Sequence, residues 1–201
     1  MPRITPLHPP YQPAIDAQLA SMMPPDVPPL LLFRTFARNP NMTGAMSGWG
    51  RYELGPGLSL SLRDREILID RTCARCGCEY EWGVHVAFFA ERAGLGIEQI
   101  TSITHGTPDD PCWIDERDRS LIRLADALHD DATVGDDLFG ALRGTFAEDE
   151  LLDAFMLCGW YHAVCFTANA CGVEPEPLAP RVDLASRWTA PAPGDAAGGD
   201  R

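Results

Sequence analysis

Apolar residues recur at intervals of three and four along most of the chain, which is the spacing of helices with one buried face. The strongest segments run from Leu30 to Phe36, from Ser61 to Gly77, from Cys78 to Arg92 and over 148–171. Further helices are expected over 15–23, 41–49, 97–103 and 135–143, and one more starts at Asp115. Only Leu58–Leu62 alternates with a period of two, and it is too short to be a convincing strand. The pattern predicts one all-α domain.

Residues that start and stop helices support these boundaries. Ser61 and Asp64 have the spacing of a capping box, in which each side chain binds a free backbone N–H. Gly94 and Gly96 end the helix that starts at Cys78, and Gly172 closes the long apolar helix.

Composition divides the chain into three parts. Residues 1–29 are rich in proline and are typical of an arm that wraps its own domain or a neighbouring subunit, and we expect it to lie against a neighbour. The helical domain is expected over 30–185. Residues 186–201, dominated by Ala, Pro and Gly, are expected to form a disordered tail.

The net charge of the chain limits the classes of molecule that it is expected to bind. The 201 residues include 16 basic and 29 acidic ones, a formal net charge of −13. Such a field repels phosphate backbones and anionic lipids, so neither nucleic acid nor a membrane is an expected partner. All basic residues are arginine, which removes lysine Schiff-base and phosphate-loop chemistry. No apolar run approaches the length of a membrane span, and the odd number of cysteines without an export signal favours a reduced, cytoplasmic protein.

The candidate chemistry centres on the helix that starts at Cys78. Cys78, Glu81, Trp82 and His85 fall on one helical face, and Glu81 is close enough to hold the His85 imidazole in one tautomer. A cysteine in the first turn is favoured as a thiolate by the helix dipole. The alternative is structural, since cysteine and tryptophan are more often buried core residues.

The residues around this helix resemble the carboxymuconolactone decarboxylase-like superfamily. The resemblance covers most of 30–177 and is carried by Arg65-Glu66-Ile67, by the run from Cys76 to His85, by Ala93-Gly94-Leu95 and by Gly159-Trp160-Tyr161-His162 with Asn169-Ala170. It implies an all-helical protein that forms homotrimers or homohexamers. The known activities of the superfamily include lactone decarboxylation and thiol-dependent peroxide reduction of the alkyl hydroperoxidase D type.

The peroxidase branch of this superfamily uses a glutamate, a Cys-x-x-Cys pair and a histidine. Glu66, Cys78 and His85 match these positions, but Glu81 occupies that of the second cysteine. A carboxylate cannot form a disulfide, so the resemblance favours acid/base chemistry over the usual redox cycle.

Other groups of cysteine, histidine and arginine residues offer alternative sites. Cys73 and Cys76 could supply an offset redox pair with Cys78. Cys158, His162 and Cys165 share a helix face. With Cys73, Cys76, Cys78 and His85 they could form a zinc site, but buried packing is favoured and no metal site is expected. The arginines near Glu66 either bind an anionic substrate or pair with surface acids, and pairing is favoured.

The sequence therefore predicts a cofactor-free enzyme that transfers a proton in a small organic acid or lactone, with decarboxylation as the leading reaction. His85 is the expected general acid or base, oriented by Glu81, with Glu66 as a relay partner and Cys78 as a fourth catalytic residue. The substrate-binding candidates are Tyr80, Trp82 and His162. Two alternatives stay open: a thiol-dependent peroxidase or disulfide reductase, and a non-catalytic oligomer that binds a small molecule.

Overall fold

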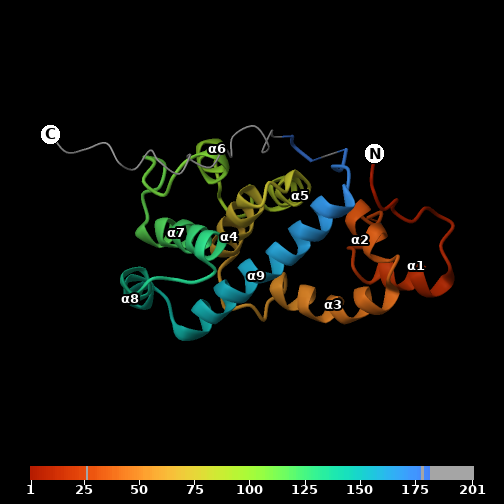
Figure 1. Ribbon diagram of the computed structural model, residues 1–201, viewed down its shortest axis with the longest axis horizontal. Helices are drawn as coiled ribbons and strands as arrows, with labels where there is room; N and C mark the ends of the chain where they lie inside the picture. Colours follow the sequence, from red (N-terminus) through yellow and green to blue (C-terminus); the bar gives the residue numbers. More distant parts are fainter. Residues whose placement is uncertain (26, 178, 182–201) are drawn as a thin grey trace.

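The structure is a computed structural model that describes residues 1–25, 27–177 and 179–181. Within these residues the chain forms helices and no strands, as the all-α prediction requires (Figure 1). The helices are α1 (Pro13–Ala20), α2 (Leu31–Phe36), α3 (Pro40–Glu53), α4 (Leu62–Arg75), α5 (Glu79–Phe89), α6 (Ile97–His105), α7 (Glu116–Asp131), α8 (Asp136–Thr145) and α9 (Glu148–Cys171). The proposed tail over 186–201 lies outside the described residues.

Helix α4 is the centre of the domain and packs against α5, α6, α7 and α9. Its start is fixed by the predicted capping box, in which Ser61 Oγ accepts from Asp64 N and Asp64 Oδ2 accepts from Ser61 N. Nearly every residue from Asp64 to Ala74 is buried, charged residues included. A charged side chain in that position needs a partner, and Arg71 finds one by donating two hydrogen bonds to Asp126. The expected pairing of the α4 arginines with acids is therefore confirmed.

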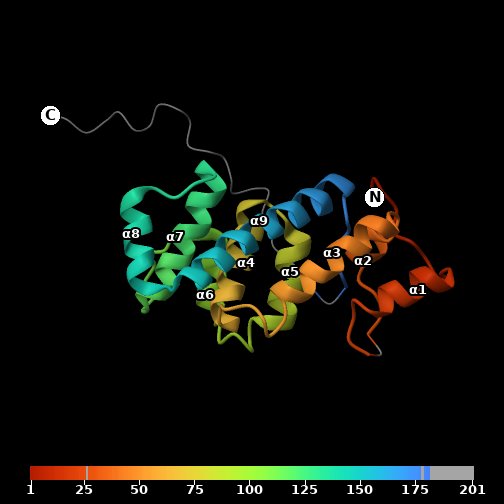
Figure 2. The same cartoon turned by 90° about the horizontal axis from the view of Figure 1, so that it is seen from below.

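Helix α9 runs across the molecule between its two ends (Figures 1 and 2). The sequence predicted no run long enough to span a membrane, but α9 meets the criteria of length and composition for such a span. Core helices of soluble proteins meet the same criteria. One side of α9 packs on α4, and a different set of its apolar residues is exposed: Leu152, Met156 and Phe166. Assembly into homotrimers or homohexamers stays a prediction.

The proline-rich arm packs against the rest of its own chain. The backbone N–H groups of Arg3 and Ile4 donate to the carbonyl of Cys171, at distances of 2.7 and 3.2 Å. Arg34 Nε donates to the carbonyl of Leu7 at 2.7 Å. These contacts place α1 and α2 at the end of the molecule opposite α7 and α8 (Figure 2).

Leu58–Leu62, judged too short to be a convincing strand, forms no strand. Residues 58–61 form a bend and an extended connection that leads into α4, with Leu58 and Leu60 buried. The alternation reflects burial of every second side chain in a connection, because Ser61 is already the cap of the next helix.

Candidate functional site

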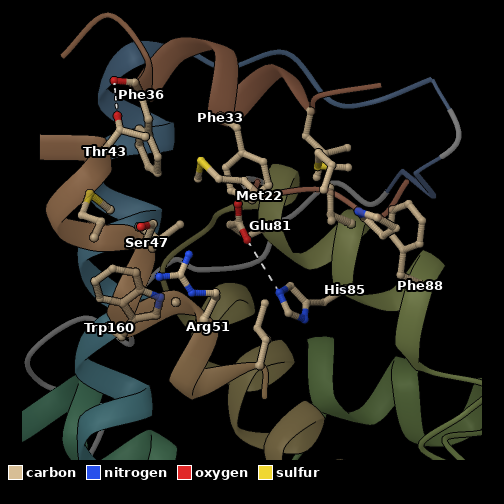
Figure 3. A pocket seen from close by; sticks show the side chains of 18 of the residues that line it. Met22, Phe33, Phe36, Thr43, Ser47, Arg51, Glu81, His85, Phe88 and Trp160 are labelled. Atoms are coloured by element: carbon tan, nitrogen blue, oxygen red, sulfur yellow. Dashed lines mark hydrogen bonds and ion pairs between the residues drawn. The ribbon is translucent and has the colours of Figure 1, made fainter. Parts of the chain in front are cut away.

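A cavity of about 560 Å³ lies between the α1–α3 end of the chain and the faces of α5 and α9 (Figure 3). Its wall is mainly apolar, and the arm contributes Met22, Met23 and Val27 to it. The other apolar side chains come from α2, α3, α5 and α9 and include Phe33, Phe36, Met46, Phe88, Phe89 and Trp160. Such a volume suits a small organic molecule.

Polar groups converge on one part of this wall. His85 and Glu81 reach it from α5, and Tyr161 reaches it from α9. Figure 3 shows the Glu81 carboxylate and the His85 ring directed toward each other, with Arg51 of α3 nearby. An apolar cavity with a few convergent polar groups is the usual form of a small-molecule site.

The two nitrogens of His85 have different partners. Nδ1 lies 2.8 Å from Glu66 Oε2, and Nε2 lies 2.9 Å from the Tyr161 hydroxyl. Because a carboxylate only accepts hydrogen bonds, Nδ1 carries the proton in the neutral ring and Nε2 holds the lone pair. Nε2, which lies near two residues of the cavity lining, Tyr161 and Glu81, is therefore the nitrogen free to take up a proton.

Glu66 is held by its own neighbour. It is fully buried, and Arg65 donates to its other oxygen, Oε1, at 2.7 Å. The Arg65 guanidinium also lies 5.1 Å from the centre of the Phe89 ring, a cation–π contact. Arg65 thus neutralises a buried carboxylate that would otherwise be costly, and the pair fixes the orientation of His85.

Glu81 lies on the other side of the imidazole, with Oε2 3.8 Å from Nε2 of His85. Burial raises the pKa of the Glu81 carboxyl, and the nearby His85 opposes this rise. The sequence analysis assigned the orienting contact to Glu81 because it stands four residues before His85. The structure gives the direct hydrogen bond to Glu66 on α4.

Charge around His85 favours its protonated form. Burial acts to lower the pKa of His85, but the charge and hydrogen bond of Glu66, with Glu81 and Asp70, raise it above its ordinary value. Burial and the nearby Glu66 raise the pKa of the Asp70 carboxyl well above its ordinary value. The site is thus a buried group of acids around one imidazole, arranged to hold a proton.

Five of the residues expected at the site do not line this cavity, and one of them, Glu66, lies behind His85 on α4. Cys78 is fully buried at the N-cap of α5, and Trp82 is buried in the core. The Tyr80 hydroxyl donates to Glu176 Oε1 at 2.7 Å and accepts from Leu32 N at 3.0 Å. His162 lies 3.0 Å from His129, outside the cavity lining. Helical spacing placed Cys78, Tyr80 and Trp82 on one helix, but packing between helices decides which side chains reach the cavity.

Sequence reasoning missed Tyr161 and the roles of Arg65 and Asp70. Tyr161 is 3% exposed, on an apolar helix where its hydroxyl requires a partner. The sequence could have indicated that Tyr161 has a hydrogen-bond partner. It could not identify that partner, because His85 lies on a different helix, α5. The arm, α2 and α3 form much of the cavity wall. Nothing in their sequence indicated that they line a site.

Comparison with known proteins gave no matching family model and no matching curated sequence. The superfamily resemblance therefore rests on the residues quoted for it.

Proposed function

We propose that the cavity is the active site of an enzyme that transfers a proton to or from a small, largely apolar carbonyl compound, with decarboxylation as the leading reaction. The observation that carries the proposal is the chain Arg65–Glu66–His85–Tyr161, which ends at a cavity wall. A general acid or base needs a fixed orientation, a proton and access to substrate. His85 has all three.

The cavity wall indicates the substrate class. Phenylalanine, methionine and tryptophan side chains favour an apolar body, and the Arg51 guanidinium supplies a positive charge for a carboxylate or carbonyl oxygen. A β-keto acid or carboxylated lactone with an apolar substituent combines these features. This substrate class also agrees with the superfamily resemblance.

The residues at the site account for each bond and proton in the proposed decarboxylation. The bond between the carboxylate carbon and its neighbour breaks, carbon dioxide leaves, and the electron pair becomes an enolate. Nε2 of the protonated His85 then gives its proton to the carbon, and Glu66 stabilises the imidazolium before that step. The Tyr161 hydroxyl is within hydrogen-bond distance of Nε2 and positions the ring. Water restores the proton to His85.

The thiol-dependent alternative has less support. Cys78, its expected nucleophile, is fully buried and does not line the cavity, and Glu81 replaces the second cysteine. Cys73 and Cys165 lie with their Sγ atoms 3.6 Å apart, but both are buried. Peroxide in the cavity would meet an imidazole and a carboxyl group first.

The test is release of carbon dioxide from a panel of β-keto acids and carboxylated lactones with substituents of increasing size. His85→Gln should lower kcat by about 10²-fold or more, the usual contribution of a general acid, while ligand binding in the apolar cavity persists. His105→Gln, a histidine outside the cavity, is the matched control. Retained turnover in His85→Gln, or no turnover of any member by the wild type, would overturn the proposal. Binding without turnover would favour the non-catalytic alternative.

Glu66→Gln tests the positioning role separately. The variant removes the charge that raises the pKa of His85, with Asp70, Glu81 and Arg65 unchanged. Because the protonated form is active, activity falls as pH rises through the pKa of His85. That limb of the kcat profile should move to lower pH in Glu66→Gln. A merely structural role for Glu66 would reduce activity without moving the limb.

A further inference from the structure

A second cluster of reactive side chains lies outside the cavity, where the C-terminal ends of α4 and α7 meet α9. Cys76 follows the last turn of α4, His129 is in the last turn of α7, and His162 is near the middle of α9. One donor atom from each lies within 4.8 Å of the others, and all three residues are partly exposed. None of the three lines the cavity around His85.

The spacing of these atoms agrees with that of ligands around one metal ion. The Cys76 Sγ atom lies 3.9 Å from His129 Nδ1, which lies 3.0 Å from His162 Nε2. Around a tetrahedral zinc ion, bond lengths of about 2.3 Å to sulfur and about 2.0 Å to nitrogen separate such ligands by roughly 3.3–3.6 Å. These two distances fall on either side of this range, and shifts of a few tenths of an ångström would bring each of them to it.

The surroundings prepare His162 to act as a ligand. Its Nδ1 lies 2.7 Å from the Cys158 carbonyl, which only accepts, so Nδ1 carries the proton and Nε2 presents its lone pair to the cluster. A backbone carbonyl on the far nitrogen is the usual way in which proteins orient a metal-binding histidine. At Cys76, the side-chain amide of Asn169 donates to the backbone carbonyl at 2.9 Å and ties this turn to α9.

We propose that Cys76, His129 and His162 bind one zinc ion, with water in the fourth coordination position. A thiolate with two imidazoles is a donor set for zinc rather than for calcium or magnesium, which take oxygen ligands. Binding releases the Cys76 thiol proton to solvent and places the His129 proton on Nε2, which leaves Nδ1 to coordinate the metal. The partial exposure of all three residues gives the ion a route of entry.

This site differs from the one considered from sequence. The zinc site considered there combined Cys158, His162 and Cys165 of α9 with Cys73, Cys76, Cys78 and His85; buried packing was favoured over it, and His129 was not part of it. The structure brings His129 from α7 and Cys76 from the end of α4 to His162. Ligands from three separate helices cannot be recognised from spacing along the chain.

The experiment uses the full, untagged chain, freed of metal with a chelator and titrated with Zn²⁺ by calorimetry. We expect one equivalent bound, with affinity lowered at least tenfold in Cys76→Ser, His129→Gln and His162→Gln. Cys112→Ser and His105→Gln are the matched controls, because each removes the same kind of side chain outside the cluster and should bind as the wild type does.

A spectroscopic measurement on the wild type keeps the test independent of how the variants fold. Co²⁺ in place of zinc should show a thiolate charge-transfer band and the intense visible bands of a four-coordinate ion. One equivalent of Zn²⁺ should also raise Tm, since a ligand that binds only the folded state stabilises it. Binding that is as tight in Cys76→Ser as in the wild type, or cobalt bands without thiolate character, would overturn the proposal. Failure of this site would leave the proton-transfer proposal at His85 unaffected.

Discussion

Glu53 offers a quantitative test of how this fold treats a buried carboxyl group. It is the last residue of α3 and its side chain is fully buried. Burial, followed by the charge of Asp153, raises its pKa from 4.5 to about 7, against an opposing contact with Trp49. Asp153 itself is engaged by the Tyr52 hydroxyl at 2.6 Å and by Ser59. Glu53 is therefore neutral in the folded protein under mildly acidic conditions.

The sign of the effect on stability follows from the direction of the shift. A carboxyl whose pKa is raised by folding contributes stability that is present below its unfolded pKa and is lost as pH rises through its folded pKa. For Glu53 this window runs from 4.5 to about 7. At about 1.4 kcal/mol per unit, the upper bound of the loss is about 3.5 kcal/mol. We expect about half of this, because Tyr52 and Leu54 beside it are exposed and water screens the charge.

The assay compares the free energy of unfolding of wild type and Glu53→Gln by urea denaturation at several pH values. Glutamine keeps the shape and removes the titration. The two proteins should be similar near pH 4, and the variant should be about 2 kcal/mol more stable near pH 8. Glu91→Gln, at an exposed position, controls for the loss of one negative charge from this acidic chain. A stability difference that does not change with pH would refute the reasoning.

Two further substitutions test the central helix. Ser61→Ala removes the cap of α4 and should cost about 1 kcal/mol of unfolding free energy, whereas Thr101→Ala, an exposed hydroxyl in α6, should change it little. A cost within experimental error would show that the capping box does not stabilise α4. Asp70 has a raised pKa and no hydrogen-bond partner for its carboxyl among the described residues, so the wild type should lose stability relative to Asp70→Asn as pH rises above the ordinary carboxyl range. Equal stabilities of the two proteins across that range would contradict a raised pKa at Asp70.

The helices were predictable because their signals are local. The expected segments coincide with the observed helices to within a few residues, and Ser61 and Gly172 stand at the boundaries they were expected to mark. Periodicity and capping depend on neighbours a few residues apart along the chain. Leu58–Leu62 alternates like a strand because this connection buries alternate residues, and its short length was the reason not to predict a strand.

The site was predictable only in part. His85, Glu66 and Glu81 do lie together, yet the orienting partner is Glu66 rather than Glu81. Residues four apart on one helix are neighbours, but a side chain on a crossing helix can come closer, as the contact of 2.8 Å from α4 shows. Tyr80 and Trp82 turned inward to the core for the same reason, since α5 is buried on most of its surface.

Helix α9 contributes a residue to each of the two proposed sites, and these two residues point in different directions. Tyr161 and His162 are adjacent in sequence, so their side chains leave the helix about 100° apart. Tyr161 is directed to His85 at the cavity, and His162 to His129 and Cys76 on the side of α4 and α7. One apolar helix, held by packing on α4, thereby sets the position of a proton-transfer group and of a metal ligand. The two chemistries share a scaffold, but each depends on its own side chains and is tested by its own variants.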